Sequence, residues 1–456
     1  MTITYNALSG ALAAQAALNT VSQNIANSQT KGYTRQGVLL QATASDPGTK
    51  SAGNGVQIGS LLRFSDSYKA QQMWRSNSEL GSLSQVQPYL TQMETVMSDD
   101  KSSLSYGIDN FFKALNAAGV DPTSTPLRQQ VITAADSMSQ QFNSIYNVTA
   151  AQVISVQQQQ QAILPQLNES LAGIAALNQQ IVAVSGAGTN TSALQDKREQ
   201  LIDSVASQVG VEVIMNPDGT ASVSLKSGQP LVVSNMAASL EFVTTSGAST
   251  LTLTFAKSKF KLDDTKVGGQ LGGLGNYKQN TLLPLQKSIS EIAGQMAQMV
   301  NDQFSAGFKS DGTAGEPLLE FNPSSASGLL QVVDGFQTTD LAFSSDGTPG
   351  DSGNLQQLVG IKGKPITLSS LGSVLLGDAD TQIVGKLGID SQQNQSQLKT
   401  ATTIRTQAED DWKSTSAVNT DEEAINLVEF QNMYQANMKV IAVANTLFDS
   451  TLQMFG

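Results

Sequence analysis

The sequence predicts a mainly α-helical fold with a β-rich insertion, and three observations support this. Both ends of the 456-residue chain carry apolar residues at heptad spacing, which is typical of helices that pair as a coiled coil. Long segments between the two ends keep the helical period, so we expect a long-helix bundle domain. Between residues 210 and 272 apolar and polar residues alternate, which indicates a small outer β domain.

The C-terminal helix is expected from Thr420 to Gly456, with no proline or glycine inside it. Asp421 to Glu423 place negative charge in the first turn, where the helix dipole favours it. Two neighbouring apolar rows, each with a step of seven, form one wide stripe. These rows are Leu427, Tyr434, Ile441, Phe448 and Phe455, and Met433, Val440, Leu447 and Met454. A helix this apolar and roughly 50 Å long cannot stand alone in water.

The N-terminal helix, expected from Ile3 to Ile25, supplies a partner. Its stripe alternates spacings of three and four and contains Ala7, Ala11, Ala14, Leu18, Val21 and Ile25. We expect the two terminal helices to pair and the pair to pack against further copies. The alternative is that they cover the core of a monomeric domain, and periodicity alone does not separate the two.

Composition narrows the function classes. The chain has no cysteine and no histidine, which removes the usual nucleophile, general base and metal ligands, so we expect no enzyme, cofactor or metal site. A net charge of −12 without a basic cluster argues against nucleic acid. No apolar run is long enough for membrane insertion, and the N-terminal segment lacks the pattern of a cleaved signal peptide.

The first half of the chain is expected to contain a folded connector and then long helices. A polar turn around Gly32 leads to strands at 38–43 and 56–62, with turns at 46–48 and 53–55. Helices follow over 66–97, 107–118, 127–183 and 192–209, and Pro88 and Pro165 are their expected weak points. The glutamine run 157–161 is interpreted as a solvated face.

The second half begins with the β-rich insertion. A hairpin is predicted over 211–225, strands at 231–233, 240–245 and 251–255, and a glycine-rich end at 268–273. Asp218, Asp311 and Asp346 each precede glycine, and turns are favoured over calcium loops because the spaced acidic ligands are missing.

Helices are then expected over 276–306, 368–387 and 390–413, with turns and short strands at 307–364. The last of these helices should turn Leu398, Ala401, Ile404, Ala408 and Trp412 inward. We expect an inner coiled-coil domain of 1–30 and 420–456, a helical middle domain of 31–209 and 273–419, and an outer β domain of 210–272. Both termini should lie at one end and the insertion at the other.

Several stretches resemble one family. The connector ANSQTKGYTRQ and the C-terminal VNTDEEAINLVEFQNMYQANMKVIAVANTLFDS are similar to those of bacterial flagellar axial proteins. Within that group the chain resembles the FlgK family of hook-associated proteins at the first hook–filament junction. The internal segments IAGQMAQMVNDQFSAG, SDGTAGEPLLEF and LAFSSDGTPGDSGNLQQLV carry this narrower resemblance. Family members with two outer domains have a longer insertion than this chain.

The resemblance implies a mechanical role in an extracellular structure, the bacterial flagellum. It implies self-association into a ring, contact with the hook protein and the second hook–filament junction protein, and an export chaperone on the C-terminal helix. Export would proceed by the flagellar type III pathway without a cleaved signal peptide. The expected assembly interface comprises Leu18, Val21, Ile25, Leu427, Phe430, Tyr434, Ile441, Phe448 and Phe455. The expected domain connector residues are Asn27, Gly32, Tyr33 and Arg35.

Two other functions stay open. One is another flagellar axial protein of the hook or rod type, since these proteins share the terminal motif. The other is a carboxylate-based hydrolase in the β-rich insertion. That insertion offers only scattered acids without a base or nucleophile at a telling spacing: Glu212, Glu241, Asp263 and Asp264.

Overall fold

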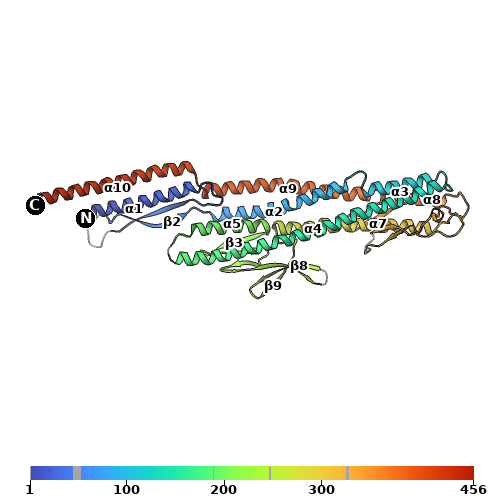
Figure 1. Ribbon diagram of the computed structural model, residues 1–456, viewed down its shortest axis with the longest axis horizontal. Helices are drawn as coiled ribbons and strands as arrows, with labels where there is room; N and C mark the ends of the chain where they lie inside the picture. Colours follow the sequence, from blue (N-terminus) through green and yellow to red (C-terminus); the bar gives the residue numbers. More distant parts are fainter. Residues whose placement is uncertain (1, 45–52, 188, 246–247, 325–327, 456) are drawn as a thin grey trace.

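The computed structural model describes residues 2–44, 53–187, 189–245, 248–324 and 328–455. The molecule is long and narrow, and both chain ends lie at the same end of it (Figure 1). That end consists of helix α1 (Thr2–Ala26), helix α10 (Thr420–Phe455) and the antiparallel hairpin of β1 (Gln36–Ala42) and β2 (Val56–Arg63). The predicted mainly α fold with a β-rich insertion is confirmed. The expected turn at 46–48 lies outside the described residues.

Long helices build the middle of the molecule. They are α2 (Ser67–Met97), α3 (Leu104–Ala118), α4 (Thr125–Gly186), α5 (Ser192–Gln208) and α9 (Ala379–Ser416). Asp66 caps α2, because its carboxylate accepts hydrogen bonds from the free N–H groups of Tyr68 and Lys69. Helices α2 and α4 continue through Pro88 and Pro165, so neither proline ends its helix.

Two apolar clusters form the core, and α2 and α4 take part in both. The first cluster joins the second half of α2 and the first half of α4 to α3 and the segments after residue 270. The second joins the start of α2, the end of α4 and α5 to the β-rich insertion. Helices α1 and α10 contribute to neither cluster, so they must be held by other contacts.

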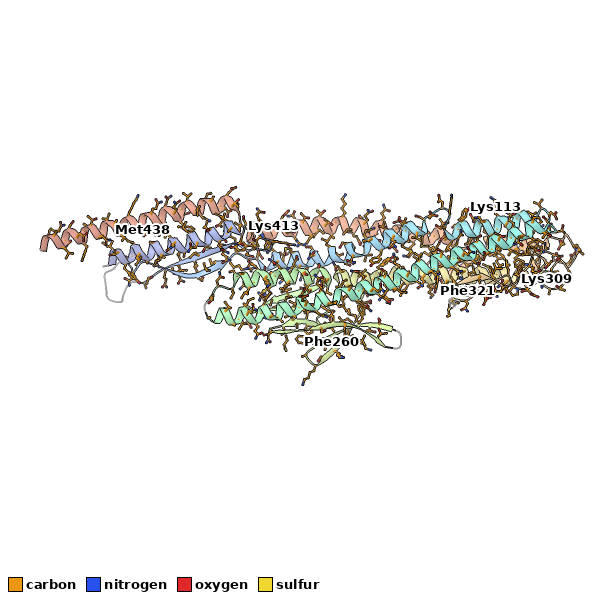
Figure 2. All side chains as sticks on the ribbon, in the orientation of Figure 1. Lys113, Phe260, Lys309, Phe321, Lys413 and Met438 are labelled. Atoms are coloured by element: carbon orange, nitrogen blue, oxygen red, sulfur yellow. The ribbon has the colours of Figure 1, made fainter. Side chains whose placement is uncertain are left out.

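The β-rich insertion contains two antiparallel sheets. One has the order β3 (Val211–Met215), β4 (Ala221–Leu225), β5 (Pro230–Val233) and β6 (Met236–Ala237). The other has the order β7 (Ser239–Thr245), β8 (Ala248–Phe255) and β9 (Ser258–Leu262). The insertion lies alongside the middle of the molecule (Figure 1), where Figure 2 labels Phe260. Our expectation that it lies at the end opposite the termini is wrong, because it packs on α4 and α5.

The glycine-rich segment is helical, contrary to our expectation of a helix starting at residue 276. Helix α6 (Gly269–Tyr277) leads through a π-helical turn at Lys278–Leu282 into α7 (Leu283–Ser305). Glycine is required here because α6 and α2 approach closely: a Cβ on Gly273 would lie 2.4 Å from the backbone oxygen of Ser82. Close packing therefore overrides the low helix propensity of glycine.

The far end carries small elements. They are β10 (Leu319–Phe321), β11 (Leu330–Val332), α8 (Gly353–Gly360), β12 (Pro365–Leu368) and β13 (Gly372–Leu375). The helix that we predicted over 368–387 is therefore wrong in its first half. Gly372, with φ of +81°, follows the tight turn after β12 and begins β13, and α9 starts only at Ala379.

Three side-chain expectations have clear outcomes. Gln160 in the glutamine run is buried, where it bonds with Asp264 and Lys278, so this run is not uniformly solvated. Ile404 on α9 is exposed instead of pointing inward. Asp218 folds its carboxylate onto the N–H and hydroxyl of Thr220, as a turn does. The same bonding pattern recurs at Asp311 and Asp346.

Candidate assembly surface and domain joint

The two terminal helices lie side by side and run antiparallel. Near one end, the amide of Asn24 donates to the buried carboxylate of Glu423 at 3.1 Å. Near the middle, Gly10 lies so close to α10 that a Cβ there would be 2.6 Å from the side-chain oxygen of Asn437. In an antiparallel pair one residue number rises as the facing number falls, so facing residues keep a constant sum. Both contacts have the same sum and therefore give the same register.

Small residues on α1 allow this close approach. Its buried side is formed by Ala7, Gly10, Ala11, Ala13, Ala14, Ala17, Val21 and Asn24. The side of α10 that is least exposed repeats at spacings of three and four and consists of Glu423, Asn426, Phe430, Met433, Tyr434, Asn437, Ile441 and Ala444. The pair thus has a narrow, alanine-lined contact with modest apolar burial.

The predicted interface residues divide into two groups. Val21 is buried, and Leu18, Phe430, Tyr434 and Ile441 are half-buried along the contact between α1 and α10. Ile25 and Leu427 are each 37% exposed and Phe448 is 64% exposed, so these three are more open to solvent than the first group. The position of the Phe455 side chain lies outside what the structure describes.

The reason for this division is the register. Asn24 lies opposite the first turn of α10, so Ile25 is at the open end of the pair. Phe448 lies beyond the residues of α10 that face α1. Phe448 therefore does not face α1 of its own chain, and its role in the assembly interface stays a prediction that concerns a contact between copies.

The outer sides of the pair carry many exposed apolar side chains. On α1 they are Ile3, Tyr5, Leu8 and Leu12, and on α10 they are Ile425, Val428, Met438, Val440, Val443, Leu447, Phe448, Leu452 and Met454. Figure 2 labels Met438 on α10. The hairpin of β1 and β2 adds Leu39, Ile58, Leu61 and Leu62. A pair of helices that exposes this many large apolar side chains is typical of an interaction site.

A polar joint connects the pair to the helical middle of the molecule. Asn24 holds the connector, because its side chain bonds to both the N–H and the carbonyl of Gln36 at 3.0 and 2.8 Å. The hydroxyl of Tyr33 donates to the Asn24 side-chain oxygen at 3.0 Å. Burial and the carboxylates of Asp196 and Glu423 raise the pKa of Tyr33 to about 12, so this hydroxyl stays protonated at neutral pH.

Arg63, at the end of β2, anchors the joint to α5. Its guanidinium lies 2.8 Å from Asp196 and 2.8 Å from Glu199 and donates to the hydroxyl of Thr34 at 3.0 Å. Asp196 also accepts from the backbone N–H of Thr34 at 3.1 Å. These charged groups are almost completely buried, so the geometry of the connector is tightly specified.

The other connector residues have separate roles. Arg35 pairs with Glu422 on α10, stacks on the ring of Phe64 at 4.4 Å, and accepts at its carbonyl from the N–H of Phe64. Gly32 has φ of +74°, which a side chain would strain. Asn27 bonds back to the carbonyl of Gln23 and so closes the end of α1.

Sequence reasoning missed the residues that complete this joint. Asn24, Arg63, Asp196 and Glu423 were not predicted as connector residues. A polar Asn in an otherwise apolar stripe was a usable signal for Asn24. No local pattern marks Arg63 and Asp196, because they meet only in the folded chain.

Three of the four acids of the alternative hydrolase bond to separate partners. Glu212 pairs with Arg75, Asp264 pairs with Lys278, and Asp263 bonds to Thr265. In the described residues, no group of three or more acidic side chains is arranged to hold a metal ion. Of the helices in that same part of the chain, none combines the length and hydropathy that crossing a bilayer requires.

Comparisons with known proteins agree with the features of both ends and of the middle. The model of the flagellar hook-associated protein FlgK helical domain matches residues 90–319, which is half of the chain. Models of the flagellar basal body rod protein and of the C-terminal part of the rod FlgEFG proteins match residues 5–34 and 414–454. The two rod-type matches thus cover only the terminal helices and the connector.

Curated relatives match nearly the whole chain. Flagellar hook-associated protein 1 of Escherichia coli K12 is 26% identical over 545 residues, covering 98% of this chain and 99% of the relative. That of Bacillus subtilis 168 is 26% identical over 498 residues, covering 97% and 96%. Both aligned lengths exceed the 456 residues of this chain, so these relatives contain segments that it lacks.

A solved structure is also similar. The flagellar hook junction protein FlgK from Burkholderia pseudomallei aligns with a TM-score of 0.52 at 26% identity, over 55% of this chain and 47% of that one. The match to the FlgK helical domain covers half of the chain, and the relatives cover nearly its full length. The chain therefore belongs to the FlgK family of flagellar hook-associated proteins, structural components of the bacterial flagellum at the junction of hook and filament.

Proposed function

We propose that copies of this chain assemble into an adaptor ring at the hook–filament junction by packing their α1–α10 pairs against one another. The observation that supports this proposal is the exposed apolar surface on both helices, whose facing sides are already in contact. If the terminal helices served only to cover a monomeric core, they would belong to an apolar cluster, and they belong to neither.

Energetics favour several contacts for each copy. Burying one large apolar side chain contributes at most about 1.5–3 kcal/mol. Association of two molecules costs roughly 4–15 kcal/mol in lost freedom and side-chain ordering. A pair with exposed apolar residues on both α1 and α10 can touch two neighbours at once, and a closed ring gives every copy both contacts.

The proposed partners follow from the family. Its members associate with other flagellar axial proteins, and we propose the hook protein on one side and the second hook–filament junction protein on the other. Before assembly, the apolar face of α10 needs protection, so an export chaperone is proposed to bind there. We propose that export removes no signal peptide from α1. Residues of α1 from Ala7 onward contact α10, so cleavage there would destroy the helix pair.

The proposed division of the chain has a mechanical purpose. Residues 1–30 and 420–456 would form the inner domain, 31–209 and 273–419 the middle domain, and 210–272 an outer region. The buried joint around Arg63 and Asn24 would fix the angle between the first two. No enzymatic activity is proposed, because Glu212 and Asp264 of the insertion are held in two separate ion pairs.

Complementation of a strain that lacks its own copy tests the proposal. Leu12→Asp places a charge on the exposed face of α1 without touching α10, so the monomer should keep its helical content while filaments fail to attach to finished hooks. Asn19→Asp, at an exposed polar site of the same helix, is the matched control and should support filaments. Electron microscopy of hooks and circular dichroism of the purified variants provide the two measurements.

The outcome also separates the alternatives. Normal filaments with Leu12→Asp would contradict assembly through this face. If the strain without the chain lacks hooks or rods altogether, instead of carrying bare hooks, the hook or rod alternative applies.

A further inference from the structure

Helix α10 is longer than its partner. The register set by Asn24 with Glu423 and by Gly10 with Asn437 places Thr2, the first residue of α1, opposite Asn445. Helix α10 continues from there to Phe455, roughly 15 Å further. Figure 1 shows the C-terminal end of α10 extending beyond the N-terminal end of α1. We call residues 446–455 the overhang.

The overhang is apolar and its described side chains are exposed. Leu447, Phe448, Leu452 and Met454 are all well exposed, and Asp449 is its one charged residue. Phe448 continues the row of Tyr434 and Ile441, which contacts α1 earlier in the helix. The overhang therefore presents the surface that binds α1, at a place where its own α1 has ended.

A groove lies next to the start of the overhang. It has a volume of about 740 Å³ and is lined by Thr4, Tyr5, Asn6 and Leu8 of α1, Thr43 and Asn54 beside the hairpin, and Ile441 of α10. Tyr5 and Leu8 are strongly exposed on its floor, and none of its lining residues is charged. The overhang cannot fill the groove of its own chain, because α10 continues past Ile441 as a helix and leads away from it.

We infer that the overhang of one copy lies in the groove of the next copy. The two copies point the same way and are displaced along the long axis by about 15–20 Å, which brings Leu452 of one copy level with Tyr5 to Leu8 of the next. This inference rests on the proposed assembly of α1–α10 pairs and names the surfaces that meet.

A second copy is the occupant that the surfaces fit. The overhang carries the stripe that already binds an α1 helix, and the groove of another copy offers an uncovered face of α1. The overhang has one charged residue and the lining of the groove has none, so neither surface contains the charge cluster that would select a charged partner. Pairing them covers Phe448 and Leu452 together with Tyr5 and Leu8 in one contact.

Cysteine cross-linking tests the contact, because the chain has no native cysteine. Chains with Leu8→Cys and chains with Leu452→Cys are expressed together in a strain that lacks its own copy, and isolated hook–filament complexes are oxidised. Each chain has one thiol, so every disulfide joins two copies. We expect a disulfide-linked dimer on a non-reducing gel, several-fold above the control pair Gln15→Cys and Leu452→Cys.

The control tests the register. Gln15 lies on the same side of α1 one heptad further along, which displaces it by about 10 Å. A disulfide forms only between residues whose Cα atoms lie within about 7 Å. A junction that assembles with no more dimer from Leu8→Cys than from the control overturns the inference and leaves the proposed ring standing.

A second variant keeps the test decisive if the cysteine chains assemble poorly. Phe448→Asp alters a side chain that is exposed in the single chain, so the fold should hold, whereas filament attachment should be lost. Gln453→Asp, an exposed polar site in the same overhang, is the control. Attachment that survives Phe448→Asp overturns the inference. A native chain that forms no junction at all overturns the proposed function itself.

Discussion

Replacing Arg63 by alanine tests the buried joint directly. The Arg63 side chain is only 9% exposed, and those of its partners Asp196 and Glu199 are 8% and 14% exposed. Burial lowers the pKa of Arg63, but the carboxylates of Glu199 and Asp196 outweigh this and raise it, so the guanidinium stays charged. Its removal leaves two buried carboxylates without a cation.

The expected cost is large because these carboxylates cannot reach water. Breaking a buried ion pair by removing one partner typically costs about 3–5 kcal/mol. Arg75→Ala is the matched control, since Arg75 pairs with Glu212 at 2.7 Å with side chains 54% and 39% exposed. An exposed pair of this kind contributes about 0–1 kcal/mol.

Urea unfolding of the purified chain provides the assay. The chain has two tryptophans, Trp74 and Trp412, and both lie in the apolar cluster beside the joint, so their fluorescence reports its unfolding. A loss of less than about 1 kcal/mol for Arg63→Ala, or an equal loss for Arg75→Ala, would refute the reasoning. Replacing Arg63, Asp196 and Glu199 together by apolar residues should recover most of the loss.

Three further predictions concern other parts of the chain. Gly81→Ala should destabilise the chain by several kcal/mol, because its Cβ would lie 2.2 Å from the backbone oxygen of Ser207. Gly385→Ala, in open space on α9, should instead stabilise it by about 0.5–1 kcal/mol, and urea unfolding measures both. Amide hydrogen exchange in the purified monomer should be faster in α1 and α10 than in α2 and α4, because the terminal pair belongs to neither apolar cluster. Burial raises the pKa of Asp380, so above that pKa the ionised carboxylate lowers the free energy of unfolding. Asp380→Asn removes this charge, and its gain in free energy of unfolding over the native chain should be largest at neutral pH.

Each of these has a contradicting result. Equal effects of alanine at Gly81 and Gly385 would remove the steric argument. Protection of α1 and α10 equal to that of α2 would mean that the pair is fully stable in the monomer. For Asp380, the advantage of asparagine must shrink as the pH falls through the raised pKa, because the native carboxyl then becomes neutral as well. A pH-independent difference would contradict this.

The sequence predicted the terminal helices well because their signal is repeated and local. Heptad rows such as that of Tyr434 and Ile441 can be recognised from the local sequence alone. The small residues of α1 predicted that another helix approaches it closely. Which side chains of α10 stay exposed was not predictable in the same way. The heptad spacing marks two adjacent apolar rows but does not say which of them α1 covers. Phe448 shows this, because it continues the right row beyond the end of α1.

The misses have a common physical cause in long-range contacts. Residues 268–275 contain five glycines, which locally oppose a helix. Close approaches in the folded chain make them suitable, at Gly273 to α2 and at Gly275 to the backbone of Asp264. Thr34 and Asp196 are 162 positions apart, so no window of sequence contains their hydrogen bond. The joint is therefore the part of the site that sequence patterns describe least.

The joint and the apolar surface solve different parts of one mechanical problem. Charged hydrogen bonds are directional, so the buried contacts of Arg63 and Asn24 fix how the terminal pair leaves the helical middle. Apolar contacts are not directional, so in the proposed ring the outer faces of α1 and α10 would tolerate small changes of position between neighbouring copies. Because Tyr33 has a pKa of about 12, its bond to Asn24 does not titrate near neutral pH, and the joint keeps its geometry there. In the proposed adaptor ring, the joint would supply a fixed internal angle and the outer faces an adaptable contact between copies.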